Sequence, residues 1–413
     1  MKDLYLKAAH WLHEHIVERE EKWHYEGGKR DLRLDLLRGF AAFAMITDHI
    51  GGADSYLYSI TGGDRFVVSA AEVYVFISGA VMGIVYHNVF TRQGIGATLM
   101  KAAHRAWQLY VITIVLTLSF AAIGAAWDLW WRPDTSGGIA TYVLEVLTLH
   151  RTMYLTDIPM MYTILLLAAG PVLLLLAQGY TRIALAGSFA VWLLWQISPS
   201  SAEVPWHIEG NTVFNIAAWQ VLFVAGLAIG WHRAKLETLF SHLARPVVFV
   251  SLATVSVAIV ALYVAQLTVL DEIKQNSTAV SLFFDKANVP AGRLLTFGLL
   301  MTFAFVLTTL FWEPIKRLTG WLLMPFGENS LKAYSLHVFV VALVAKFGPE
   351  VLGGRVDLVE SRTALQILGV AAIWLLIVLQ PEAISLLKQC QARVGQHRFF
   401  SHVSTQPGGS APS

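Results

Sequence analysis

Four ionisable side chains lie inside one apolar stretch, "RLDLLRGFAAFAMITDHIGG" at residues 33–52: Asp35, Arg38, Asp48 and His49. A helix turns by about 100° per residue, which places Asp35, Arg38 and His49 within about 60° of one another on one face. Asp48 falls on the flank of that stripe. Ionisable groups inside a membrane helix are costly and normally face a bundle interior or a water-filled cavity. The stripe therefore indicates a functional site.

Two structural explanations of the stripe remain open. Asp35 and Arg38 are spaced for an i,i+3 ion pair at the membrane interface. Asp48 and His49, about 21 Å further along the axis from Asp35, could have reached the outer headgroups. In either case these residues would stabilise the helix in the membrane and perform no chemistry.

A second stretch, "AEVYVFISGAVMGIVYH" at residues 71–87, strengthens the functional interpretation. Glu72, Gly79 and Gly83 share one helical face, and a G-x-x-x-G pair permits close approach of another backbone. We predict that this helix packs on the first one and brings Glu72 near Asp48 and His49. A histidine flanked by two carboxylates has the elements of a general base with an orienting partner.

The composition identifies the class of protein. Of 413 residues, 56% are hydrophobic and 14% are charged, whereas soluble proteins carry about 25% charged residues. The net charge of +2 and the scattered basic residues argue against nucleic-acid binding. A single cysteine, Cys390, excludes an intramolecular disulfide framework and a thiolate metal cluster, and no metal motif is present. The sequence predicts an all-α, polytopic membrane protein.

Apolar runs of bilayer length predict about ten transmembrane helices, near 35–52, 67–87, 104–126, 157–178, 181–198, 213–231, 246–270, 291–312, 321–346 and 363–386. Lys and Arg are more numerous beside the helix ends on one side of the membrane, the side on which both termini lie. We therefore expect both termini in the cytoplasm. Residues 1–33 resemble a cytoplasmic amphipathic segment without a cleavable signal peptide. Residues 34–390 form the transmembrane domain, and 391–413 are a polar, disordered cytoplasmic tail.

Five segments in order along residues 30–390 resemble the OpgC family. They are "RLDLLRGFAAFAMITDHI", "AEVYVFISGAVMGIVY", "TDIPMMYTILLL", "FNIAAWQVLFVAGLAIG" and "FGENSLKAYSLHVF". That family consists of membrane proteins that add succinyl groups to osmoregulated periplasmic glucans, within a broader group of membrane acyltransferases. The resemblance implies acyl transfer at the membrane more firmly than it implies a succinyl group or a glucan, because scaffolds are reused.

The resemblance leads to a mechanistic hypothesis for a multi-pass protein of the bacterial inner membrane. His49 would act as general base on a hydroxyl of a periplasmic glycan, with Asp48 or Glu72 orienting its ring. The acyl donor would be a cytoplasmic acyl-CoA, with no further cofactor. A periplasmic glycan-synthesis partner that delivers the acceptor is an open alternative.

The remaining candidate residues would line the path of the two substrates. Arg33, Arg38, Arg92 and Arg105 are expected on the cytoplasmic side, where guanidinium groups bind phosphates in bidentate fashion. Asp35, Tyr162, Asn215 and Gln220 would face the substrate cavity. Interhelical hydrogen bonding also explains Asn215 and Gln220, positive-inside anchoring explains Arg92 and Arg105, and His337 fits a packed side chain.

Aromatic residues in the predicted outer loop "AAWDLWWRPDTSGG" allow two explanations. Trp127, Trp130 and Trp131 beside Asp128 and Arg132 suit a carbohydrate. Tryptophan is also enriched at membrane interfaces without any ligand.

A transporter or flippase of a glycan or lipid intermediate is the rival class, since it could use the same charged stripe. Such folds usually carry broken helices at matching positions in two halves. Pro159 and Pro171 interrupt one predicted span, and the second half has no obvious counterpart.

Overall fold

The computed structural model describes residues 24–27, 30–52, 55–61, 68–199, 205–236, 250–258, 261, 285–352, 354 and 358–380. Within these ranges the chain is helical, without a β-strand, and one isolated bridge joins Arg151 to Glu209. The longer helices are α3 (Leu32–Gly51), α5 (Ala70–Ala126), α7 (Asp157–Ala177), α8 (Thr181–Ile197), α9 (Ile216–Trp231), α14 (Ala291–Leu310), α15 (Trp312–Glu328), α16 (Ser330–Val351) and an unlabelled helix, Val359–Gln380. Two shorter helices are α4 (Tyr56–Thr61) and α6 (Ile139–Leu147).

Five of the described helices are long and apolar enough to cross a bilayer: α5, α7, α14, α16 and Val359–Gln380. Helices α8 and α9 are apolar but shorter. The chain is therefore a helical membrane protein, as the sequence predicts. The count of ten spans and the cytoplasmic location of both termini stay predictions. Most of the predicted span 246–270, most of the segment 1–33 and the whole tail 391–413 lie outside the described residues.

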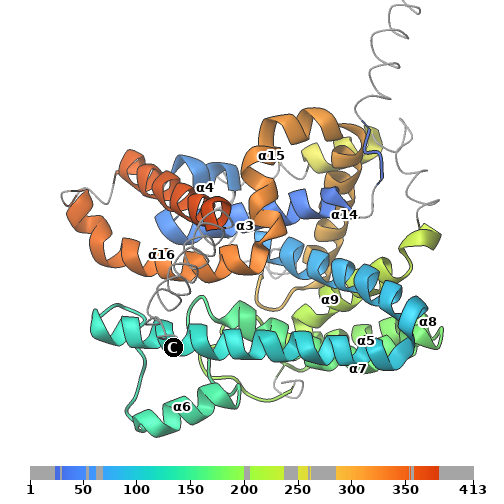
Figure 1. The fold of residues 1–413 in the computed structure, drawn as a ribbon, viewed down its shortest axis with the longest axis horizontal. Coiled ribbons are helices and arrows are strands. Elements are labelled where there is room, and N and C mark those ends of the chain that lie inside the picture. Colours follow the sequence, from blue (N-terminus) through green and yellow to red (C-terminus); the bar gives the residue numbers. More distant parts are fainter. Residues whose placement is uncertain are drawn as a thin grey trace, which may run out of the picture.

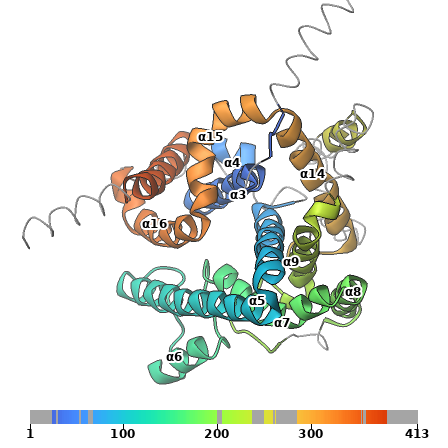
Figure 2. The ribbon, with the colours of Figure 1, turned by 45° about the vertical axis from the view of Figure 1, so that its right-hand side comes forward.

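Two predicted spans, 67–87 and 104–126, are the two halves of α5. Gly94 interrupts this helix with φ 80° and ψ −179°, a conformation that favours glycine because a Cβ would clash there. The halves run in different directions on either side of it (Figures 1 and 2). The predicted span 321–346 is wrong in its boundaries, since α15 ends at Glu328 and α16 begins at Ser330.

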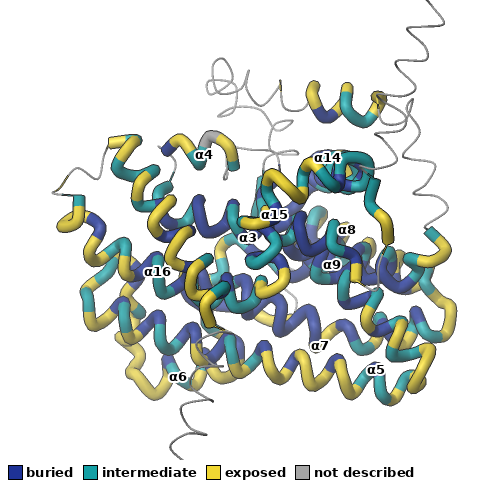
Figure 3. Tube along the Cα trace, turned by 45° about the horizontal axis from the view of Figure 1, so that its top comes forward, coloured by how far each residue is buried: buried dark blue, intermediate teal, exposed yellow. Residues whose placement is uncertain are grey.

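Helix α3 lies at the centre of the bundle and contacts α15, α5, α16 and α14. Helices α16 and Val359–Gln380 lie at one end of it and α8 and α9 at the other (Figures 1 and 2). The buried residues concentrate in α3, α7 and α9 (Figure 3). Glycines allow α3 to touch α15: a Cβ at Gly39 would overlap the carbonyl of Leu323, and a Cβ at Gly327 would overlap that of Asp35.

The G-x-x-x-G pair of α5 packs against α9. Helix α5 also contacts α3, as predicted, but the glycines are not the residues that make that contact close. A Cβ at Gly79 or Gly83 would overlap the carbonyls of Phe223 or Leu227. The contact is reciprocal, because a Cβ at Gly226 or Gly230 would overlap carbonyls of α5. Small residues on both helices let the two backbones approach closely. The sequence showed that α5 needs a close partner but could not say which helix supplies it.

This glycine contact predicts a destabilising effect of one methyl group. Gly79→Ala should lower the thermal unfolding temperature of the detergent-solubilised protein, because overpacking costs about 1–3 kcal/mol. Gly187→Ala is the matched control, since a Cβ at Gly187 meets nothing within 4 Å and replacing a helical glycine gains up to about 1 kcal/mol. Equal unfolding temperatures for the two variants would contradict the contact between α5 and α9.

Candidate functional site

His49, near the end of α3, is paired with a second histidine on α16. His49 Nδ1 lies 3.2 Å from His337 Nε2, and the rings stack with centroids 5.3 Å apart. His337 Nδ1 lies 2.5 Å from the carbonyl oxygen of Tyr334. A carbonyl can only accept, so His337 Nδ1 carries the proton and, in a neutral ring, Nε2 accepts from His49 Nδ1–H. His49 Nε2 is then left with its lone pair.

The two carboxylates expected beside His49 have other described partners. Asp48 accepts a hydrogen bond of 2.5 Å from the Thr61 hydroxyl of α4. Glu72 accepts from the backbone N–H of Ser69 at 3.0 Å and from its hydroxyl, and forms an ion pair with Arg293 of α14. Glu72 and Arg293 are both fully buried. Glu72 therefore joins α5 to α14, and the hydrogen-bond partner of His49 Nδ1 is His337, whose Nε2 accepts from it.

Sequence reasoning placed His337 among packed side chains. It is indeed buried, but it is also the hydrogen-bond partner of His49. The signal available was its position in "FGENSLKAYSLHVF", one of the five segments that resemble the family. The sequence could not show that α16 crosses the end of α3.

Asp35 and Arg38 form the expected ion pair, and they form it in a buried setting. The residue Asp35 is 2% exposed. Its carboxylate lies 2.8 Å from Arg38 Nη2. Arg30 binds both oxygens of the same carboxylate. Arg38 also donates from Nε, at 2.9 Å, to the carbonyl of Gly327. The pair thus fixes the crossing of α3 and α15.

A cavity of about 330 Å³ brings together three of the predicted site residues: Arg38, Arg105 and Tyr162. It is bounded by α3, both halves of α5, α7, α9 and α16. Its other polar lining residues are Tyr74, Ser78, Tyr86, Lys101, His104, Gln108 and Ser330. Arg105 hydrogen-bonds Gln108 at 3.3 Å. The cavity therefore combines a cluster of cationic side chains with a largely apolar interior.

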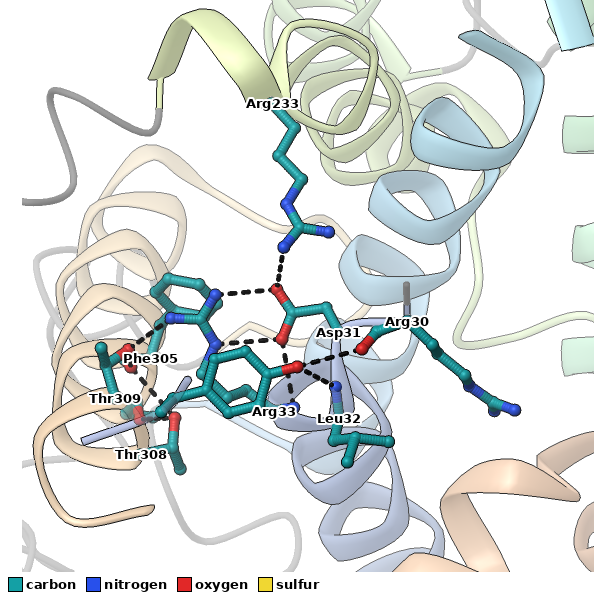
Figure 4. Close-up of polar contacts among 10 residues, drawn as sticks. Arg30, Asp31, Leu32, Arg33, Arg233, Phe305, Thr308 and Thr309 are labelled. Atoms are coloured by element: carbon teal, nitrogen blue, oxygen red, sulfur yellow. Dashed lines mark hydrogen bonds and ion pairs between the residues drawn. The ribbon is translucent and has the colours of Figure 1, made fainter. Parts of the chain in front are cut away.

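Arg33 lies in a different place from Arg38 and Arg105. Its guanidinium binds Asp31 and donates to the Thr309 hydroxyl at 2.8 Å, and the rings of Tyr25 and Phe305 are each 4.3 Å from its carbon Cζ. Arg233 reaches the same Asp31 carboxylate at 3.0 Å from just beyond α9 (Figure 4). Arg33 lines a second cavity, of about 500 Å³. Its described contacts tie α3 to α14.

Gln220 makes interhelical hydrogen bonds, and Asn215 bonds to the segment that precedes α14. The Gln220 side chain accepts from the Ser188 hydroxyl at 2.6 Å and donates to the Ser188 carbonyl at 2.7 Å, which joins α9 to α8. Asn215 donates to the carbonyl of Ala287 at 3.2 Å. Neither residue lines the cavity that contains Arg38 and Arg105. The contacts of Gln220 match its structural alternative, interhelical hydrogen bonding.

The buried pair predicts that Glu72 contributes to stability. Glu72→Gln should lower the thermal unfolding temperature strongly, because removing one partner of a buried ion pair costs about 3–5 kcal/mol. Asp128→Asn, which removes the partner of the exposed Arg132, is the control and should change the unfolding temperature little. A Glu72→Gln protein that keeps its unfolding temperature but loses its activity would return Glu72 to the catalytic site.

Comparison with known proteins agrees with the resemblance in the sequence. The model of one protein family, described as OpgC protein, matches residues 30–383, which is most of the chain. No curated protein and no solved structure matches this chain. The matched region includes the histidine pair, the buried carboxylate of α3 and the cavity that contains Arg38 and Arg105. The chain therefore belongs to the OpgC family.

Proposed function

We propose that this chain is a multi-pass O-acyltransferase of the bacterial inner membrane. It moves an acyl group from cytoplasmic acyl-CoA to a hydroxyl of a periplasmic glycan. Succinyl is the leading candidate for the acyl group. Membership of the OpgC family supports a membrane transferase that modifies glucans. The observation that carries the mechanism is the hydrogen-bond chain from the Tyr334 carbonyl through His337 to His49. It leaves the Nε2 atom of His49 available as a base.

In the proposed step, His49 Nε2 removes the proton of the acceptor hydroxyl as its oxygen attacks the thioester carbonyl. The new ester bond forms as the carbon–sulfur bond breaks, and the thiolate of coenzyme A leaves with the proton that His49 had taken. His337 holds His49 in the required tautomer by accepting from Nδ1–H. Asp48, beside His49 in the sequence, adds negative charge that would favour the transient imidazolium.

The cavity that contains Arg38 and Arg105 is the proposed site of the donor. Its Lys101, His104 and Arg105 side chains suit the phosphates of coenzyme A, and Tyr74 and Tyr162 provide walls for the acyl-bearing arm. Ser330, which lines the cavity, shares a face of α16 with Tyr334 and His337 at i, i+4 and i+7. A path from the cavity to His49, which lies about 16 Å along α3 from Arg38, would follow that face.

The histidine pair predicts a graded set of activities. His49→Gln should lower the rate of acyl transfer by about 10²–10⁴-fold, the usual contribution of a general base. His337→Gln places an amide oxygen near the position of Nε2 and should keep much more activity than His337→Leu, which has no acceptor. The measurement is transfer from labelled acyl-CoA by purified protein, with unfolding temperatures as the control for folding.

Three outcomes would count against this mechanism. Near-normal transfer by His49→Gln would exclude His49 as the base. Equal activity of His337→Gln and His337→Leu, in proteins of equal stability, would exclude the hydrogen bond as the orienting contact. Glycan movement across vesicles without acylation of the product would favour a transporter.

The donor cavity predicts a selective change in KM. Arg105→Gln should raise the KM for acyl-CoA by about tenfold through loss of one charge-assisted hydrogen bond, with little change in unfolding temperature. Arg92→Gln is the matched control, because Arg92 lies on the same helix, is exposed and does not line the cavity. Equal KM values for the two variants would place the phosphates of the donor elsewhere.

A further inference from the structure

A run of aromatic rings leads from His49 to the protein surface. The Tyr154 ring meets the His49 ring edge-on, with centroids 6.1 Å apart, and the Trp130 ring lies 4.8 Å from Tyr154. Trp131 supports both, at 5.3 Å from Trp130 and 6.3 Å from Tyr154. His49 is thus the inner end of a surface made of aromatic side chains.

The members of this run differ in exposure. Trp131 is buried and stacks on Phe120 of α5, with centroids 4.8 Å apart and rings almost parallel. Trp130 is 73% exposed and Tyr154 is 36% exposed. Trp131 therefore anchors the loop after α5, whereas the other two side chains are accessible to solvent. We call Trp130 and Tyr154 the aromatic platform.

The platform is positioned by the same residue that positions the histidine pair. The Tyr334 hydroxyl donates, at 2.8 Å, to the carbonyl of Leu155, next to Tyr154. The carbonyl of Tyr334 accepts from His337 Nδ1. One residue of α16 therefore fixes both the loop that carries Tyr154 and the tautomer of His49, so that the platform and the proposed base keep a constant relation.

We propose that the aromatic platform is the acceptor subsite, and that it stacks a glucose ring of the glycan beside His49. A pyranose ring presents C–H bonds on its face and hydroxyl groups at its edge. A ring lying on Trp130 would rest its apolar face on the aromatic π-surface. Tyr154, tilted by 51° from Trp130, would border its edge, from which hydroxyls would be directed toward His49 Nε2. This proposal depends on the proposed function, since it supplies the acceptor hydroxyl for that reaction.

An interfacial tryptophan belt is the competing explanation, and the molecule contains a matched comparison for it. Trp107 is 63% exposed and stacks on Tyr110 with centroids 5.4 Å apart. This pair has the same composition as the platform, but no ring contact joins it to His49 among the described residues. If both pairs only belong to a tryptophan belt, replacing either tryptophan should have the same effect on glycan binding. If the platform is a subsite, only the replacement of Trp130 should weaken that binding.

The first test measures binding and needs no turnover. Saturation-transfer NMR with the full-length, detergent-solubilised protein would follow three glucose oligosaccharides: cellohexaose, laminarihexaose and maltohexaose. We expect at least one to bind the wild type, Trp130→Ala to weaken that binding about tenfold, and Trp130→Phe to keep most of it. Trp107→Ala should bind as the wild type does.

The second test measures transfer to two acceptors of different shape. Trp130→Ala should raise the KM for the bound oligosaccharide about tenfold and leave transfer to glycerol, which has no ring face, unchanged. Unfolding temperatures of the variants show whether they are folded, and Trp130→Phe provides a second measure if the alanine variant is unstable.

The outcomes separate this proposal from the proposed function. No binding of any oligosaccharide to the wild type, equal binding by Trp130→Ala, or an equal loss in Trp107→Ala would overturn the subsite. Binding that depends on Trp130, in a protein that transfers no acyl group, would support the subsite and overturn the proposed acyl transfer.

Discussion

The buried carboxylate of Asp35 has to be neutralised inside a largely apolar bundle, and the packing of α3 follows from how this is done. Arg30 and Arg38 both bind it, and Arg38 also donates to the carbonyl of Gly327. A carboxylate left unpaired in this setting would cost several kcal/mol. The pairing therefore fixes both the rotation of α3 and its crossing with α15, where Gly39 and Gly327 leave no room for a Cβ.

Once α3 is fixed, the direction of every other side chain on its stripe is determined. His49 then faces α16, where His337 Nε2 accepts a hydrogen bond from its Nδ1–H group. Arg38 faces the cavity bounded by α5, α7 and α16. One rigid helix thus carries a residue of the proposed donor cavity and the proposed base, and their separation of about 16 Å is set by the helical rise.

A second framework holds the first half of α5. Interlocking glycines bring it against α9, and the Glu72–Arg293 pair ties its start to α14. The break at Gly94 then lets the second half turn back, so that Lys101, His104 and Arg105 enter the same cavity as Tyr74 and Ser78 of the first half. Most of the polar lining of this cavity therefore comes from the two halves of one helix, and Arg38 of α3 and Tyr162 of α7 add to it.

The sequence alone determined the features that depend on local pattern: apolar helices, the ionisable stripe of α3, the Asp35–Arg38 pair, the need for a close helix contact at Gly79 and Gly83, and the family. Only the tertiary structure decided the partners. It gave His49 the imidazole of His337, paired Glu72 with Arg293, directed the glycines to α9 and separated Arg33 from Arg105. The physical reason is that helical periodicity determines which side chains share a face of one helix. The partner of such a side chain depends on which helices cross. The crossings follow from the burial of charge and from backbone contacts, summed over the whole bundle.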